Sequence, residues 1–199
     1  MAGTLVDPKQ VAIASGDYYI HRKLGLGFRR PRHWVFEALT GFPDLSRQQI
    51  VQNLDAEQQR VFNEEQMETL VAAITKYAKA DERFGPCITV HRNADDYDPA
   101  VDSLWAIVDD YVEGMPFLLK DYACIVAPHE VRLSNCEAVQ LKSRYVFEHE
   151  RIAPVLIEDE CIAVAHRNAL YSIHLYDAPA ISEGAGEAFA QFKSSLHLI

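Results

Sequence analysis

Two short segments of the sequence share the order His-Arg-Asn-Ala. His91 and Arg92 follow one apolar run, and His166 and Arg167 follow another. Histidine changes charge near neutral pH, and arginine binds phosphate oxygens through two parallel hydrogen bonds. If both segments reach one cleft, one imidazole could remove a proton and the other deliver one, while the guanidinium groups neutralise a phosphate. The pattern is therefore a candidate for phosphodiester or nucleotide hydrolysis.

The same two segments resemble the two-histidine phosphoesterase family. In that family each histidine is followed two positions later by serine or threonine, whereas Asn93 and Asn168 occupy those positions here. The resemblance covers these two segments alone. It implies an acid and base pair of histidines, with the two arginines holding the phosphate. The alternative is that all of these residues end strands and make hydrogen bonds in turns.

The sequence carries no other catalytic or metal-binding motif. It contains no G-x-G-x-x-G, Walker loop, G-x-S-x-G elbow or H-E-x-x-H. The four cysteines are far apart without any C-x-x-C spacing, and three of them lie in apolar runs. We therefore expect buried free thiols, no metal site and no cofactor. These cysteines are Cys87, Cys124, Cys136 and Cys161.

Positive charge is concentrated between Tyr19 and Trp34. This basic segment holds five lysines and arginines and no carboxylate, and removing its five charges from the net charge of -10 leaves -15 for the remainder. Aromatic side chains alternate with the cations, a composition typical of interaction hot spots. Arginine also outnumbers lysine, which favours desolvated contacts with carboxylates. The predicted binding residues are Arg22, Arg29, Arg30, Arg32 and Trp34.

An acidic stretch spans residues 95–113, with seven carboxylates and no basic residue. Asp98 as a cap, Pro99 in the first turn and an apolar stripe predict a helix over 99–113. The opposite face of that helix carries Asp102, Asp109 and Glu113. These three carboxylates form either a solvated helix face or the acidic half of a docking surface.

Composition indicates one folded protein. Its 199 residues are 49% hydrophobic and 24% charged, values of an ordinary globular chain. No run approaches the ~18 apolar residues of a membrane span, and no leader-like start is present, so we expect a cytoplasmic protein without membrane contact. The net negative charge restricts any nucleic-acid contact to the basic segment.

The elements that must position these residues change in type near residue 85. Apolar spacing predicts helices within 31–82, and alternation predicts strands from Phe117 onward. An amphipathic helix after Ser182 should cover the sheet. The expected fold class is α+β, with a helical N-terminal half and an antiparallel or mixed sheet in the C-terminal half. Residues 1–34 form an N-terminal arm with the basic patch, and 35–199 a single domain.

These patterns lead to one main interpretation and two alternatives. We interpret the chain as a non-enzymatic assembly or protein-interaction subunit that docks its basic arm onto an acidic surface. The partner is another protein or a second copy, so we expect a homo-oligomer or a part of a larger assembly. One alternative is a small phosphodiesterase or nucleotide hydrolase with paired histidines. The other is an acidic inhibitor or immunity-type protein that masks a basic partner.

Overall fold

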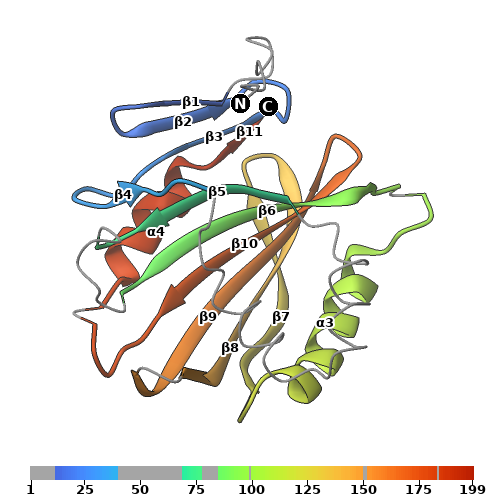
Figure 1. Ribbon diagram of the computed structural model, residues 1–199. Coiled ribbons are helices and arrows are strands. Elements are labelled where there is room, and N and C mark those ends of the chain that lie inside the picture. The colour runs from blue at the N-terminus through green and yellow to red at the C-terminus, as the bar shows by residue number, and fades with distance from the viewer. Residues whose placement is uncertain (1–11, 40–68, 78–84, 99, 150–151, 183) are drawn as a thin grey trace, which may run out of the picture.

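A computed structural model describes residues 12–39, 69–77, 85–98, 100–149, 152–182 and 184–199 of the chain. Within these ranges the protein is mostly β-structure, arranged as two antiparallel sheets with two helices (Figure 1). The helices predicted over 40–68 and 78–84 lie outside the described residues.

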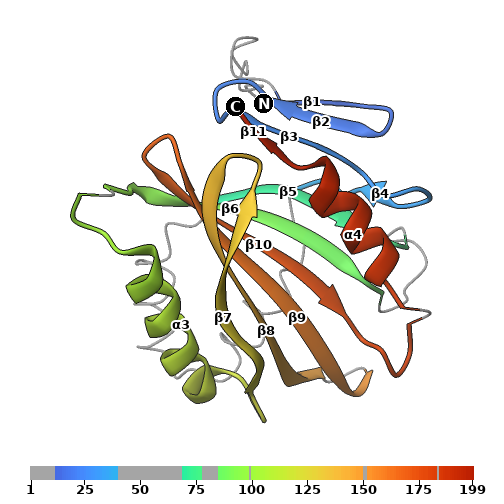
Figure 2. The same ribbon diagram turned by 180° about the vertical axis from the view of Figure 1, so that it is seen from behind.

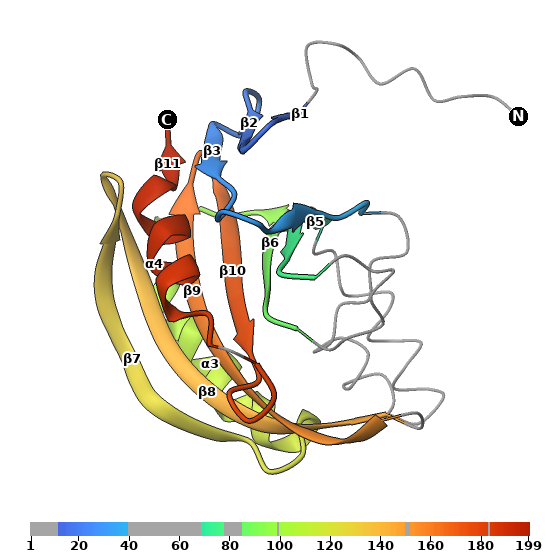
Figure 3. The same cartoon turned by 90° about the vertical axis from the view of Figure 1, so that its left-hand side faces the viewer.

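The larger sheet has seven strands, and every neighbouring pair is antiparallel. Figure 3 shows its long outer strands curving strongly. The strands, in their order across the sheet, are β4 (Val35–Phe36), β5 (Thr69–Thr75), β6 (Cys87–Asp96), β10 (Ala169–Asp177), β9 (Ile152–His166), β8 (Cys136–His149) and β7 (Ala123–Leu133).

The smaller sheet joins the two ends of the described chain. Its order is β1 (Ala12–Ser15), β2 (Tyr18–His21), β3 (Leu26–Arg29) and β11 (His197–Leu198). The basic segment therefore supplies two strands that pair with each other, and β3 also pairs with the C-terminal strand.

The two helices cover opposite faces of the larger sheet. Helix α4 (Gly186–Ser195) lies over one face of the sheet (Figure 2). It buries Phe189 and Phe192, which share a core with Ile173. Helix α3 (Leu104–Leu118) packs Val108 against the other face. Because side chains alternate along a strand, successive residues of β10 enter these two different cores.

The expectation of a helical N-terminal half is wrong, because the described residues there are strands. Residues 69–75 form β5 rather than a helix. Residues 71–74 are all buried, and a short apolar run buried on both faces satisfies helical spacing as readily as strand spacing. Residues 35–36 form β4, the edge strand of the larger sheet.

The predicted acidic helix exists, but its boundaries differ. It begins at Leu104, because Ser103 is the cap and its hydroxyl accepts from the Ala106 amide at 3.3 Å. It also continues through Pro116 to Leu118, where sequence alone predicts a strand beginning at Phe117. Proline inside a helix removes one N–H and costs about 3 kcal/mol, and packing of Leu118 and Met115 against a core cluster opposes that cost.

The C-terminal half follows the sequence pattern more closely. Strand β8 alternates buried and less buried residues, as expected from its sequence, and the C-terminal helix covers the sheet. Residues 152–166 form one long continuous strand, β9. Within the described ranges, neither helix is long and apolar enough to cross a membrane.

Candidate functional site

The His91-Arg92 segment lies within strand β6, so its two side chains point to opposite faces of the sheet. His91 is opposite Ser172 in the register and Arg92 is opposite Tyr171. The imidazole of His91 is buried beneath α3, with its ring centroid 5.9 Å from that of His174. Arg92 instead faces the α4 side of the sheet, together with Tyr171.

His166 and Arg167 lie at the turn between β9 and β10, beside the smaller sheet. The Nε2 atom of His166 is 3.2 Å from the carbonyl oxygen of Ile199, and its Nδ1 is 3.8 Å from Cys136 Sγ. His91 and His166 therefore belong to different surroundings, and the two imidazoles cannot act on one reacting atom. The acid and base pair of the hydrolase alternative has no geometric support.

The two arginines of these segments do meet. Arg92 and Arg167 line one open groove of about 750 Å³, between the smaller sheet and the edge of the larger one. The other lining residues come from β2 and its turn, from β4 and the residues just after it, from β5, and from β10. They are Tyr19, His21, Lys23, Leu24, Phe36, Glu37, Leu39, Leu70, Val71, Ala72, Ala73 and Tyr171.

The Tyr171 hydroxyl lies close enough to both guanidinium groups to sense their charges. Burial raises the pKa of this phenol, while the charge of Arg92, a hydrogen bond from it and the charge of Arg167 act in the opposite direction. The same hydroxyl is 3.5 Å from the carbonyl oxygen of Leu24. Arg167 Nη1 donates to the Lys23 carbonyl oxygen at 3.3 Å, which ties this guanidinium to the turn of the smaller sheet.

The turn itself depends on Gly25, which has φ +64°. A Cβ at this position would meet the carbonyl oxygen of Ile199, and would lie 2.8 Å from both Arg167 Cζ and His166 Nε2. The Ile199 amide also donates to the Gly25 carbonyl at 2.8 Å. Glycine is therefore needed where the β2–β3 turn, the C-terminus and the wall of the groove meet.

The groove is cationic within an acidic protein. Among the lining residues that the structure describes, Lys23, Arg92 and Arg167 outnumber the one carboxylate, Glu37. Glu37 accepts a hydrogen bond from Thr75 Oγ1 at 2.8 Å. Burial and the charge of Lys23 lower the pKa of His21, while a hydrogen bond to its own backbone acts in the opposite direction. Burial, followed by the proximity of Tyr171, raises the pKa of Tyr19 to about 12, so the phenol stays neutral.

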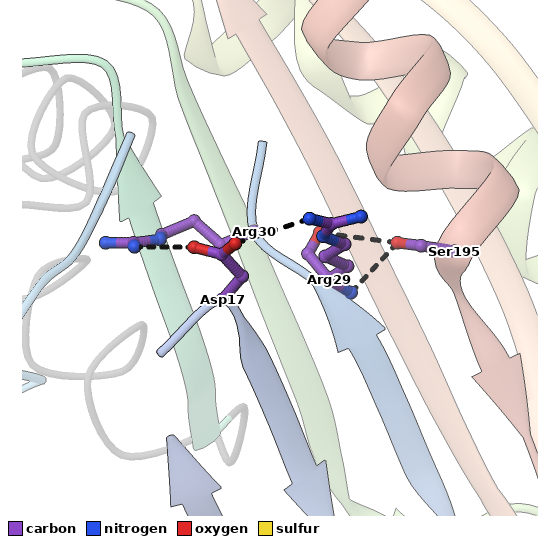
Figure 4. Close-up of polar contacts among 4 residues, drawn as sticks. All are labelled: Asp17, Arg29, Arg30 and Ser195. Carbon is purple, nitrogen blue, oxygen red and sulfur yellow. Dashed lines mark hydrogen bonds and ion pairs between the residues drawn. The ribbon is translucent and has the colours of Figure 1, made fainter. Parts of the chain in front are cut away.

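Two arginines of the basic segment share one carboxylate within the subunit. Arg30 Nη2 is 2.9 Å from Asp17 Oδ1, and Arg29 Nη2 is 3.4 Å from Asp17 Oδ2 (Figure 4). The backbone amide of Arg29 donates to Ser195 Oγ at 2.9 Å, which fixes β3 to the end of α4. Hydrogen bonds from Arg30 and Arg29, in that order, lower the pKa of Asp17.

The remaining predicted docking residues divide into buried and exposed groups. Trp34 is only 4% exposed and packs edge-on against Phe189, so it belongs to the core. Arg22 and Arg32 are exposed and form no ion pair with the part of the chain that the structure describes. Docking through all five predicted residues together is therefore inconsistent with this fold.

The predicted acidic residues are only partly assembled into one surface. Asp109 and Glu113 are exposed on α3. Asp102 precedes the helix, and its Oδ2 accepts from the Asp98 amide at 2.7 Å. Asp102 therefore shapes the turn that leads into α3, while the other two carboxylates remain solvated.

A second cluster, which sequence reasoning missed, lies buried beneath α3. His174 Nδ1 is 2.9 Å from Asp159 Oδ2, and His174 Nε2 is 4.0 Å from Cys161 Sγ. Burial alone lowers the pKa of His174, but the charges of Cys161 and Asp159 raise it well above its usual value. The sequence indicated only that Asp159 and Cys161, two residues apart on one strand, share a face of the sheet. Their meeting with His174 depends on the register of β9 and β10.

The sheet face around this cluster is unusually polar for a buried surface. Several buried side-chain oxygens have no hydrogen-bond partner within the described chain, and buried polar atoms are normally paired. On this face they include Thr89 Oγ1, Asp159 Oδ1 and Ser172 Oγ. Across the described ranges, no three histidine, cysteine or acidic side chains converge as a metal site.

No protein-family model matches this sequence, and no match is found among curated proteins. Solved structures do resemble it. Cyanobacterial PsbP (CyanoP) from Synechocystis sp. PCC 6803 superposes with a TM-score of 0.53 at 14% identity, over 99% of this chain and 100% of that one. The chain therefore shares the fold of that protein, and at this identity the likeness shows the fold alone.

Two further solved structures resemble the chain at lower TM-scores. A protein from Bacteroides thetaiotaomicron VPI-5482 gives a TM-score of 0.48 at 9% identity, over 92% of this chain and 48% of that one. LpqN, involved in cell envelope biogenesis of Mycobacterium tuberculosis, gives 0.46 at 13% identity, over 86% of this chain and 82% of that one.

Proposed function

We propose that this chain is a non-enzymatic interaction protein that binds an extended acidic segment of a protein partner in the groove lined by Arg92 and Arg167. The observation that carries the proposal is the meeting of these two guanidinium groups around Tyr171. Paired guanidinium groups bind carboxylates through charge-assisted hydrogen bonds. Because most of the protein is acidic, a local cationic groove also steers an acidic partner to one place.

The edge of strand β5 supports an extended peptide as the occupant. Residues 70–73 line the groove, and β4 pairs only with the far end of β5, at Thr75 and Ile74. Within the described residues, the contacts that reach this edge are the Tyr19 hydroxyl at the Val71 carbonyl and the Glu37 amide at the Ala73 carbonyl. A sheet edge that lacks a neighbouring strand can bind a further strand, with side-chain pockets providing specificity.

The basic segment keeps a role in this proposal, although it differs from a projecting arm. Tyr19, His21 and Lys23 form one wall of the groove. Arg29 and Arg30 serve the fold through Asp17 instead. Aromatic rings beside the cations supply apolar area for the partner, which is the usual composition of an interaction hot spot.

The test measures binding of a fluorescein-labelled ten-residue peptide of alternating glutamate and leucine by fluorescence polarisation. We expect the full chain to bind it, and R92Q/R167Q to weaken binding at least tenfold. The matched control is R132Q, because Arg132 is an exposed arginine on β7 outside the groove. Affinity should also fall as salt rises from about 0.05 to 0.5 M. Equal affinity of the double variant and the R132Q control, or no binding at all, contradicts the proposal.

A further inference from the structure

The buried cluster beneath α3 is built by cross-strand pairing and is independent of the groove. Cys161 and His174 are directly opposite each other on β9 and β10. Asp159 lies two residues before Cys161, so it shares the same face of the sheet. The resulting line of Asp159 Oδ2, the imidazole and Cys161 Sγ has separations of 2.9 and 4.0 Å.

The carboxylate of Asp159 determines whether the imidazole of His174 is protonated. Asp159 is 1% exposed, and a buried carboxylate needs a positive partner to remain ionised. The imidazolium of His174 is that partner, held by its Nδ1 hydrogen bond. Its other nitrogen then carries a proton toward the sulfur, and a nearby cation favours the thiolate, which is the nucleophilic form of cysteine.

The surroundings of the sulfur are closely packed and contain polar groups. Cys161 is 5% exposed, and Tyr111 of α3 lies over the cluster with its ring centroid 6.4 Å from that of His174. Thr89 is directly opposite His174 on the neighbouring strand β6. The unpartnered oxygens of Thr89 and Asp159 are both nine-tenths or more buried. They have hydrogen-bonding capacity for a small hydroxylic molecule that reaches this cluster.

We propose that Cys161 is a modification site at which hydrogen peroxide oxidises the thiolate to a sulfenic acid. The sulfur attacks one peroxide oxygen, an S–O bond forms and the O–O bond breaks. The leaving hydroxide takes the Nε2 proton of His174 and departs as water. The thiol is oxidised by two electrons and the peroxide is reduced by two. Asp159 acts as a positioning residue that keeps the imidazole protonated and oriented.

A second cysteine of the same chain provides an internal control. Cys136 Sγ is 3.8 Å from His166 Nδ1, so it also lies beside an imidazole. The Nε2 of that imidazole is near a main-chain oxygen of Ile199 rather than the side-chain carboxylate of an Asp or Glu. Burial and the charge of Arg167 lower the pKa of His166, against the hydrogen bond to Ile199. Cys136 is more exposed than Cys161, so exposure alone predicts that Cys136 reacts faster.

The experiment exposes the folded full chain to hydrogen peroxide, removes the peroxide with catalase, and unfolds the protein in urea that contains dimedone. Mass spectrometry then gives the dimedone adduct at each cysteine against time. We expect Cys161 to be oxidised at least tenfold faster than Cys136 in the unmodified protein. Oxidation of Cys161 no faster than that of Cys136 overturns the proposal, and this comparison needs no variant.

The D159N variant tests the role of the carboxylate. We expect the Cys161 rate to fall about tenfold while the Cys136 rate is unchanged, with circular dichroism confirming that the variant is folded. The wild-type rate at Cys161 should also decline as pH rises through the pKa of His174, a readout that a purely structural role does not predict. A pH-independent wild-type rate, or an unchanged Cys161 rate in folded D159N, contradicts the mechanism.

Discussion

The side chains of His91 and Arg92 lie on opposite faces of one sheet although they are neighbours in the sequence. His91 contacts His174 beneath α3, whereas Arg92 reaches Tyr171 in the groove on the α4 side. Strand β6 therefore contributes to the buried cluster with one face and to the cationic groove with the other. The two sites are separated by the thickness of one sheet and can be altered independently.

The His174–Asp159 pair predicts how stability depends on pH. The folded protein holds the pKa of His174 well above the value of 6.5 expected for the unfolded chain. The stabilisation is therefore fully present below about pH 6.5, and is lost as pH rises through the folded pKa. Urea unfolding of the wild type between pH 6 and 9 should show this decline, whereas D159N should show a flatter profile.

The control for this pH dependence is D110N. Asp110 is an exposed carboxylate on α3, so its replacement should leave the wild-type pH profile in place. If D159N and D110N decline with pH in parallel, the ion pair at His174 does not contribute to folding as the structure indicates.

Gly25→Ala should be destabilising by about 1–3 kcal/mol, because residue 25 has a positive φ and no room for a Cβ. The matched control is Gly114→Ala in helix α3, where nothing lies within 4 Å of the added atom. Alanine is the better helix former there and should stabilise by about 0.5–1 kcal/mol. Urea unfolding measures both, and two shifts of the same sign would contradict the tight packing assigned to the β2–β3 turn.

The sequence predicted the secondary structure correctly where apolar and polar residues follow a clear period. Strand β8 and helix α4 follow from period-two and amphipathic spacing, because each has one buried face. The same spacing rule failed for residues 69–75, since β5 is buried on both faces and has no polar side to reveal its period. Helix α3 was placed too early because Asp98, a plausible cap, instead accepts from the Ala100 amide within a turn.

Both the groove and the buried cluster depend on how distant strands pair with one another. That pairing cannot be inferred from a single sequence. The repeated His-Arg-Asn segments predicted that two histidines and two arginines share one site. The pleat of β6 places His91 and Arg92 on opposite faces, so only Arg92 and Arg167 line the same groove. The ion pairs of Asp17 were overlooked because that carboxylate lies just before the basic segment. Cys161 and His174 are 13 residues apart, and their contact needed the β9–β10 hairpin register.

The two tryptophans test whether the basic segment is folded into the core. Trp34 is 4% exposed against Phe189, while Trp105 on α3 is 43% exposed. The variant W105F retains only Trp34, and the variant W34F retains only Trp105. We expect Trp34 to emit at a shorter wavelength than Trp105, and to be quenched by acrylamide several-fold less. Acrylamide is the suitable quencher because it is neutral, whereas iodide would be attracted by the neighbouring arginines. Equal quenching in the two variants would place Trp34 at the surface and restore it as a docking residue.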